Sequence, residues 1–163
     1  MSDFKYQIVE SSELEKNARF NELLLNQWDE VDDRRKTSEL NVQWQSYKVA
    51  DANRMHFWLL AIQYDEDGNQ EDILGYISMF LCPSMHTGEL TALTDTIYVV
   101  QHARGSGVGR ALLVKAEEYV AKRGVVHMMV TFKNAVNHEK LADQLGLFNY
   151  ETVYCKPLGV VNG

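Results

Sequence analysis

Proline and cysteine are both scarce in this chain of 163 residues, which contains two of each. So few prolines leave no proline-rich linker, and we find neither an internal repeat nor a low-complexity segment. The two cysteines, Cys82 and Cys155, come without an export signal, so we expect both to be reduced, small and buried. The whole chain, residues 1–163, is therefore expected to form one domain that no disulfide stabilises.

Long hydrophobic runs are also missing. No apolar segment approaches the length of about 18 residues that a membrane-spanning helix requires. The N-terminal segment MSDFKYQIVE lacks the basic region and apolar stretch of a signal peptide. Hydrophobic residues make up 45% of the chain and charged residues 24%, which is an ordinary globular composition. We therefore expect a folded cytoplasmic protein with no membrane partner.

Basic side chains are absent from the middle of the chain. Residues 61–100 carry seven acidic side chains and no Lys or Arg, whereas residues 101–163 have a net charge of +3. Nucleic-acid binding depends on Lys and Arg, so the acidic middle argues against a nucleic-acid partner and would suit a cationic substrate. Five of the acids are interpreted as the solvated tip of a hairpin: Asp65, Glu66, Asp67, Glu71 and Asp72.

Periods of 2 and 3.6 residues in the hydrophobic pattern predict the order of the elements. Strands are predicted at residues 4–10, 57–64, 73–81, 90–100, 125–132 and 150–156. Helices are predicted at residues 11–28, with a serine N-cap, at 40–49, at 112–124 and at 138–146. Antiparallel strands come first and βαβ units come late, which predicts an α+β fold rather than a doubly wound parallel sheet.

Three alternating glycines, Gly105, Gly107 and Gly109, lie between a predicted strand and a predicted helix. Glycine there lets the backbone approach a phosphate at a helix N-terminus. The GxxxxGK pattern of a P-loop is absent. A dinucleotide fold is excluded too, because the spacing is GxGxG and too little chain follows for more βα units. The pyrophosphate of an acyl coenzyme A is the remaining candidate ligand.

The segment ARGSGVGRALL matches the signature Q/R-x-x-G-x-G/A through Arg104, Gly107 and Gly109, and it follows the last strand of the meander. In these residues the chain resembles the GNAT superfamily of acyl-CoA N-acyltransferases. The resemblance continues through NHEKLADQLGLFNYE and covers residues 57–156. It implies a mostly antiparallel central sheet of about six or seven strands, with a splayed fourth and fifth strand and about four flanking helices. Residues 57–156 would form the acetyl-CoA-binding core, and residues 1–56 would supply a strand and the acceptor-side helices.

Acetyl-CoA is the cofactor that this resemblance implies. The residues expected to bind it are Tyr98, Val99, Val100, Arg104, Gly105, Ser106, Gly107, Val108, Gly109, Arg110, Asn134 and Asn137. A tight turn without a ligand is the alternative for the glycines, but a turn needs fewer special residues than three alternating glycines flanked by two arginines. No metal is expected, because Cys and His do not occur with the spacing of zinc ligands.

The same resemblance implies direct acetyl transfer to an amine, with a main-chain N–H of Val99 or Val100 polarising the thioester carbonyl. Asp95 is the one charged residue in an apolar strand and is the candidate general base, with a purely structural role as the alternative. Where the family often has a catalytic tyrosine this chain has Ala142. Tyr98, Tyr150 and Tyr154 are therefore the candidate acids for the leaving thiolate, which can also leave unprotonated.

The acceptor of the acetyl group is not determined by any motif. A protein lysine, a polyamine or another small amine would fit, and a toxin-type aminoacyl-tRNA acceptor is a second alternative. A catalytically silent CoA-binding or interaction module is the rival hypothesis, supported by Ala142. The segment CPSMHTGELTALTDTIYV is also similar to GNAT-like proteins of tailed bacteriophages, which implies the cytoplasm of a host bacterium. A homodimer is the default expectation, because folds of this family often dimerise.

Overall fold

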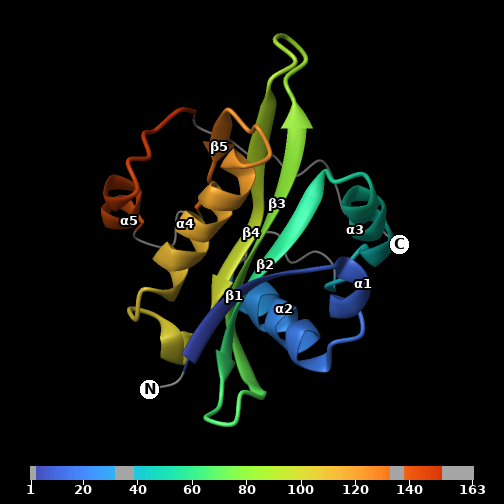
Figure 1. Cartoon of the computed structure of the whole chain (residues 1–163), viewed down its shortest axis with the longest axis vertical. Helices are drawn as coiled ribbons and strands as arrows, with labels where there is room; N and C mark the ends of the chain where they lie inside the picture. The colour runs from blue at the N-terminus through green and yellow to red at the C-terminus, as the bar shows by residue number, and fades with distance from the viewer. Residues whose placement is uncertain (1–2, 32–38, 133–137, 152–163) are drawn as a thin grey trace.

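The computed structural model describes residues 3–31, 39–132 and 138–151 of the chain. A five-stranded sheet lies at its centre (Figure 1). The strands are β1 (Asp3–Val9), β2 (His56–Tyr64), β3 (Gln70–Pro83), β4 (Leu90–Val99) and β5 (His127–Met129). Their order in the sheet follows the chain, the first three neighbouring pairs are antiparallel, and β4 and β5 are parallel. The predicted α+β class with a mostly antiparallel sheet is confirmed, but the described residues form five strands rather than the six or seven expected.

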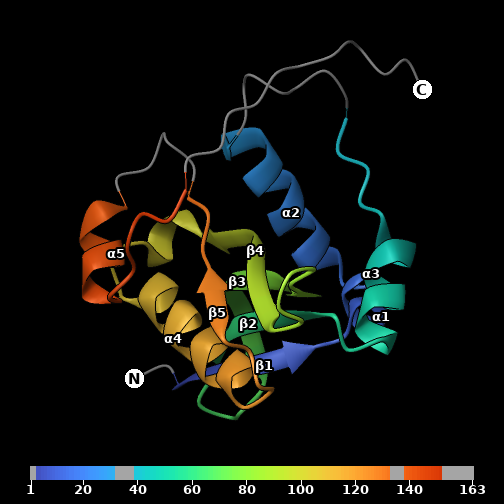
Figure 2. The same cartoon turned by 90° about the horizontal axis from the view of Figure 1, so that it is seen from above.

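The helices cover both faces of this sheet. They are α1 (Ser11–Leu14), α2 (Ala18–Val31), α3 (Trp44–Ala52), the 3₁₀ turn η1 (Gln101–Ala103), α4 (Val108–Ala121) and α5 (Glu139–Gln144). Figure 2 shows α4 and α5 on one side of the sheet and α1, α2 and α3 on the other. No helix in the described ranges has both the length and the apolar character that a membrane crossing would require. The end of the predicted last strand, from residue 152, lies outside the described residues.

The prediction of one N-terminal helix over residues 11–28 is wrong, because the structure has two helices there. Asn17 lies between the two helices. Its Oδ1 accepts a hydrogen bond of 2.9 Å from the amide of Phe20 and so caps the N-terminus of α2. The predicted serine cap does not form, and Glu10 is the N-cap of α1. Ser11 is instead fully buried, and its hydroxyl accepts from the indole N–H of Trp58 at 3.0 Å. The Ser11 hydroxyl, which the local pattern assigned to a helix cap, therefore makes a tertiary contact instead.

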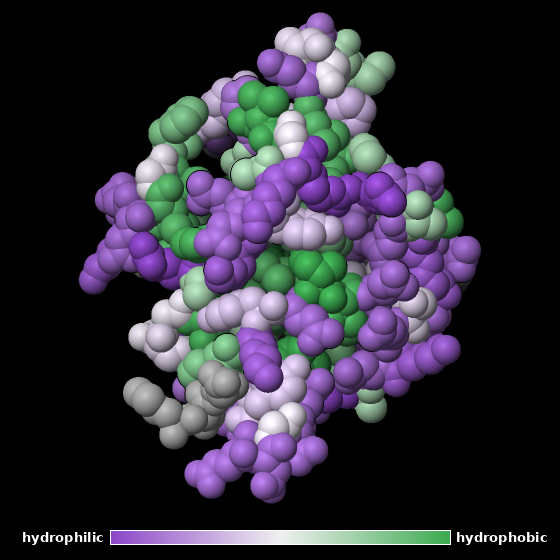
Figure 3. Space-filling model, in the orientation of Figure 1, coloured by the Kyte–Doolittle hydropathy of each residue, from purple (hydrophilic) through white to green (hydrophobic). Residues whose placement is uncertain are grey.

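Two apolar layers hold the helices against the sheet. α4 has an apolar stripe that faces the sheet, with four buried positions: Leu112, Leu113, Ala116 and Val120. On the opposite face Phe20 of α2 packs against Trp58 and Tyr76, with ring centroids 5.2 and 4.9 Å apart. In the view of Figure 3, hydrophilic residues cover the side where α1 to α3 lie, and hydrophobic residues show mainly near the middle and at the upper left, in the region of β5 and α5.

Two expectations about single residues need correction. Cys82 is exposed rather than buried, because it lies near the end of β3, where the hairpin to β4 extends beyond the helices (Figure 1). Cys155 lies outside the described residues. The acidic hairpin tip is confirmed for Asp65, Glu66, Asp67 and Glu71, which are exposed. Asp72 is half-buried instead and pairs with Arg19 of α2 at 2.8 Å.

A β-bulge interrupts the pairing of β3 with β4. Ser78 pairs with Thr96 and Met79 pairs with Thr94, so Asp95 is an extra residue of β4. Regular alternation would place the side chains of Asp95 and Thr96 on opposite faces. With the bulge, both face the layer of α2 and α3, where Tyr47 hydrogen-bonds Asp95 and Gln27 hydrogen-bonds Thr96.

The outer edge of β4 is open beyond the bulge. β5 pairs with β4 only at residues 91–93, and the last link between them is a hydrogen bond of 3.0 Å from the Thr94 hydroxyl to the Met129 carbonyl. Residues 95–99 of β4 therefore have no strand on that side within the described part of the chain. The predicted splay of the fourth and fifth strands is confirmed.

Candidate active site

Left-handed glycines lead the chain from η1 into α4. Gly105 and Gly107 have φ angles of 82° and 93°, and Gly107 is the N-cap of α4. Such angles favour glycine because a Cβ would clash with the neighbouring backbone. Gly109 is different, since its φ is not positive and a Cβ built there lies 3.5 Å from Cγ2 of Val99, an ordinary contact.

Backbone N–H groups gather at the start of α4. Within the described part of the chain, no backbone acceptor serves the N–H groups of residues 107–110, whereas the amide of Ala111 donates to the Gly107 carbonyl at 2.9 Å. The helix dipole adds partial positive charge at the same end. The side chain of Arg110 is exposed beside these amides. The amides, the helix dipole and Arg110 together suit an anionic phosphate group. The residues present at the start of α4 therefore fit the pyrophosphate of coenzyme A.

Arg104, the other predicted cation, is engaged with the protein itself. Its Nε donates to the carbonyl oxygen of Val99 at 2.9 Å, and its guanidinium pairs with Glu30 of α2. The hydroxyl of Tyr98 donates to the same Glu30 carboxylate at 2.8 Å. Burial raises the pKa of Glu30, but the hydrogen bonds from Arg104 and Tyr98 outweigh it and hold this pKa below its usual value. Arg104 therefore ties the end of β4 to α2.

The main chain of β4 presents alternate amides to its open edge. The amide of Val100 donates to the Leu74 carbonyl of β3 at 2.9 Å. In an antiparallel ladder the N–H groups of a strand point alternately toward and away from the partner, so those of Val99 and Ile97 point away from β3. Val100, one of the two predicted donors, is therefore committed to β3. Ile97, which sequence reasoning missed, faces the open edge together with Val99.

Asp95 is exposed and is held by two hydroxyl groups. Its Oδ2 accepts hydrogen bonds of 2.7 Å from the hydroxyl of Tyr47 and 3.1 Å from that of Ser78. Burial and the charge of Asp95 raise the pKa of Tyr47, so this phenol stays protonated and remains a donor. Oδ1 of Asp95 has no hydrogen-bond partner among the described residues, which leaves it available to a substrate.

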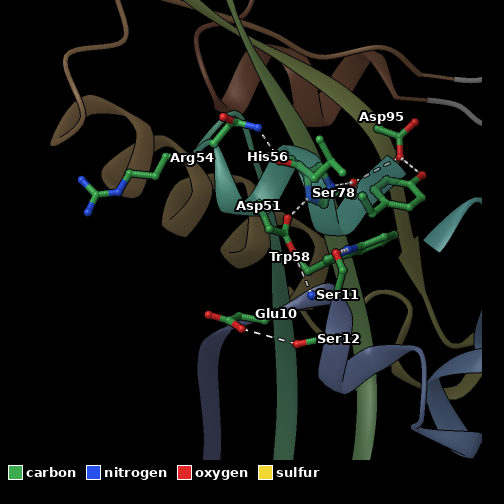
Figure 4. A network of polar contacts seen from close by, with 12 residues as sticks. Glu10, Ser11, Ser12, Asp51, Arg54, His56, Trp58, Ser78 and Asp95 are labelled. Atoms are coloured by element: carbon green, nitrogen blue, oxygen red, sulfur yellow. Dashed lines mark hydrogen bonds and ion pairs between the residues drawn. The ribbon is translucent and has the colours of Figure 1, made fainter. Parts of the chain in front are cut away.

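Behind Asp95 a buried polar chain enters the protein (Figure 4). Oγ of Ser78 lies 2.7 Å from Nε2 of His56, and Nδ1 of His56 lies 2.6 Å from Oδ1 of Asp51. Oδ2 of Asp51 accepts from the amide of Ser11 at 2.8 Å. Burial lowers the pKa of His56, and the carboxylates of Asp51 and Asp95 partly offset this. Sequence reasoning missed both His56 and Tyr47. The one local signal was for His56, a polar residue directly before the long apolar strand predicted at residues 57–64.

The other predicted site residues lie elsewhere. Tyr98 is buried beneath Arg104, with a pKa raised by burial and by Glu30, and its hydroxyl donates a hydrogen bond to Glu30. Tyr150 is 73% exposed and packs edge-on against Phe148. Ala142 lies in α5. Three further predicted residues, Asn134, Asn137 and Tyr154, lie outside the described residues.

Comparisons with known proteins agree with this geometry. Residues 17–146 match the sequence model of the acetyltransferase (GNAT) family. No curated protein sequence matches significantly. An aminoglycoside acetyltransferase from an uncultured soil metagenomic sample, solved with sisomicin, is 11% identical, with a TM-score of 0.69 over 96% of this chain and 97% of that one.

Two other solved structures share the fold. A ribosomal-protein-alanine N-acetyltransferase from Brucella melitensis is 18% identical, with a TM-score of 0.67 over 96% of this chain and 100% of that one. The glucosamine-6-phosphate N-acetyltransferase of Arabidopsis thaliana is 14% identical, with a TM-score of 0.67 over 96% and 99% of the two chains. The acceptors named for these three proteins differ in chemistry. The structural similarity therefore shows the fold of this chain and does not identify its substrate.

Proposed function

Because the chain belongs to the acetyltransferase (GNAT) family and is an acyltransferase, we propose that it moves an acetyl group from acetyl-CoA directly to a primary amine. A protein lysine, a polyamine or another small amine is the proposed acceptor. The observation that carries the proposal is that the open edge of β4 runs from Asp95 to the end of the strand, and that the chain then leads through η1 to the amides at the start of α4, which have no backbone acceptor among the described residues. Family membership favours this enzyme over a silent CoA-binding module.

The start of α4 would hold the cofactor. Acetyl-CoA supplies an activated thioester when bound. The N–H groups of residues 107–110 would donate to its pyrophosphate, and the exposed guanidinium of Arg110 would add a positive charge. Asn134 and Asn137 stay proposed contacts to the pantetheine arm.

The open edge of β4 would position the acetyl group. Ile97 is two residues from Asp95, about 7 Å along the strand, whereas Val99 is four residues away, about 13 Å. A donor to the acetyl carbonyl oxygen and a base that acts on the attacking amine must lie within one small reaction centre. We therefore assign the carbonyl contact to the N–H of Ile97, and the pantetheine contact to the N–H of Val99.

Asp95 would act as the general base. Its accessible Oδ1 would take a proton from the acceptor ammonium, while Tyr47 and Ser78 fix the carboxylate through Oδ2. Tyr98 is a poor acid for the leaving thiolate because its hydroxyl already donates a hydrogen bond to Glu30, and Tyr150 remains the second candidate. A thiol has a lower pKa than an amine, so the thiolate can also leave unprotonated.

Further expectations from the resemblance stay proposals. They are a cytoplasmic location, a bacterial host cell if the chain is phage-encoded, and a homodimer. Acetylation of aminoacyl-tRNA is a weaker alternative for the acceptor, because residues 61–100 carry no basic side chain that could contact RNA phosphates.

Thiol release from acetyl-CoA tests the proposed function. Wild-type protein is mixed with acetyl-CoA and, separately, spermidine, an aminoglycoside and a lysine peptide. We expect one amine to release thiol and Asp95→Asn to lower its rate about 100-fold or more. Asp65→Asn, on the exposed β2–β3 turn, is the matched control and should leave the rate unchanged. Full activity of Asp95→Asn would contradict the assignment of the base.

A further inference from the structure

An unbroken line of polar contacts connects the exposed Asp95 with the interior. It runs from Oδ2 of Asp95 to the hydroxyl of Ser78 at 3.1 Å, on to Nε2 of His56 at 2.7 Å, and from Nδ1 to Asp51 at 2.6 Å (Figure 4). Ser78 and His56 are 0% and 3% exposed. Burying an imidazole and a hydroxyl in this line costs free energy that a purely apolar core would avoid, so the line calls for an explanation.

Once the line has accepted a proton from the amine, its hydrogens permit two arrangements. Nδ1 of His56 faces the Asp51 carboxylate and therefore carries a hydrogen. Ser78 has one hydroxyl hydrogen and two neighbours that can accept it, Nε2 of His56 and Oδ2 of Asp95. In one arrangement Asp95 is protonated, its O–H donates to Ser78, and Ser78 donates to a neutral His56. In the other, Asp95 is a carboxylate that accepts from Ser78, and an imidazolium at His56 donates to Ser78.

The two arrangements contain the same hydrogens and differ by two short proton shifts. We propose that Ser78 and His56 relay the proton that Asp95 removes from the acceptor amine, and that the His56–Asp51 pair holds this proton while the acetyl group is transferred. The inference rests on the proposed function, since it needs Asp95 as the base. Ser78 and His56 are then positioning residues that act through Asp95, and they touch no substrate.

The steps balance in atoms and charge. An N–H bond of the ammonium breaks as an O–H bond forms on Oδ1 of Asp95. A half turn about the last torsion of the carboxyl group, which is two-fold in its preferences, brings this O–H to Ser78. Oγ of Ser78 then receives the hydrogen as its own hydrogen passes to Nε2 of His56. The Asp51 carboxylate stabilises the imidazolium that results.

The surroundings of His56 suit a transient proton acceptor. The ionisable groups that face it are Asp51 and Tyr47 from α3 and, beyond Ser78, Asp95 from β4. The rings of Trp58 and Phe80 fill the remaining space, with centroids 5.3 and 4.7 Å from the imidazole. Burial favours the neutral imidazole, so Nε2 is available as an acceptor before the reaction.

Ser78→Ala tests the relay, with Ser11→Ala as the matched control. Both serines are fully buried, and both hydroxyls bond a ring nitrogen, that of His56 for Ser78 and that of Trp58 for Ser11. Both variants should lose a similar amount of stability and keep acetyl-CoA binding. Only Ser78→Ala should lower kcat, about tenfold or more, with little change in KM. The acid limb of its pH profile of kcat/KM should also differ from that of wild type, because the proton is then no longer shared with His56.

The solvent isotope effect provides a second readout. When kcat is plotted against the fraction of heavy water, the wild-type values should follow a curve, because several hydrogens move in the rate-limiting step. The values for Ser78→Ala should follow a straight line, because one hydrogen moves. His56→Gln should behave like Ser78→Ala, because glutamine keeps a hydrogen bond but cannot hold the proton, and it serves as the test if Ser78→Ala does not fold. A wild-type pH profile and curve in both variants would overturn the relay.

The Asp95→Asn variant distinguishes a failure of the relay from a failure of the proposed function. If Asp95→Asn is inactive while Ser78→Ala and His56→Gln keep the wild-type pH profile, the base is right and the relay is wrong. If Asp95→Asn retains the wild-type rate and acid limb, Asp95 is not the base and both proposals fall.

Discussion

Gly75 of β3 and Tyr98 of β4 approach so closely that a Cβ at position 75 would lie 2.7 Å from the carbonyl oxygen of Tyr98. The same Cβ would lie 3.3 Å from the Cα of Val99 and from a methyl group of Leu112 on α4. The glycine therefore sets how closely β4 lies to β3 and α4. The opposite edge of this part of β4 is the open one, so the position of Val99 there depends on Gly75.

Gly75→Ala should destabilise the protein and weaken acetyl-CoA binding together. The clash is with backbone, so β4 must shift, and we expect a loss of about 1–3 kcal/mol in the free energy of unfolding. Gly109→Ala is the control for stability alone, because its Cβ would have room beside Val99. Urea denaturation measures the loss of stability, and calorimetric titration with acetyl-CoA measures the affinity. Unchanged affinity in Gly75→Ala would contradict the placement of the cofactor along β4.

Gly107→Val should abolish acetyl-CoA binding. At a φ of 93° a β-branched residue is strained, and its side chain would cover the amides at the start of α4. Thermal unfolding with and without saturating acetyl-CoA is the measurement, with NADH as a comparator. The wild-type midpoint should rise by several degrees, since a ligand at 100 times its Kd adds about 2.7 kcal/mol. A similar rise for Gly107→Val would show that the cofactor does not bind at this turn.

Arg110→Gln should weaken acetyl-CoA binding about tenfold, because it removes a charged contact to phosphate. Lys122→Gln makes the same change in net charge just beyond the C-terminal end of α4, about 20 Å away along the helix, and should have little effect. Titrations at two salt concentrations would show a weaker salt dependence for Arg110→Gln than for wild type. Equal affinities for the two variants would argue against a phosphate contact at Arg110.

The elements that the sequence predicted well are those with a local pattern. The apolar stripe of α4, the meander and the glycine turn each follow from a spacing of a few residues, and all are present. Asp95 could be singled out because a charge within an apolar strand is unusual. Its direction could not be predicted, since the bulge that turns it toward α3 depends on the register against Ser78.

The polar network around Asp95 could not be predicted for a related reason. Tyr47, His56 and Ser78 come from a helix and two strands, and their contacts with one another and with Asp95 depend on tertiary packing. Ser11 is the counterpart at the N-terminus, where a bond to Trp58 replaces the expected helix cap. Local preference is outweighed in both places by a buried partner distant in sequence.

The buried His56 should make stability depend on pH. Its pKa in the folded protein lies below the value of 6.5 expected in the unfolded chain. Below about pH 6.5 the unfolded chain therefore binds more protons than the folded protein. As the pH is lowered in this range, the free energy of unfolding decreases by up to about 1.4 kcal/mol per pH unit. His56→Gln should remove this part of the slope.

Urea denaturation between pH 5 and pH 8 measures the effect, and His86→Gln is the control because His86 lies exposed in the β3–β4 turn. We expect wild type and His86→Gln to lose stability in parallel below about pH 6.5, and His56→Gln to lose less. A wild type that gains stability as the pH falls, with this gain lost in His56→Gln, would mean that Asp51 and Asp95 outweigh the burial of His56 and raise its pKa. His56 would then already be protonated in the resting protein, with no capacity to accept a proton from Ser78, and the relay would be excluded on thermodynamic grounds independent of any rate measurement.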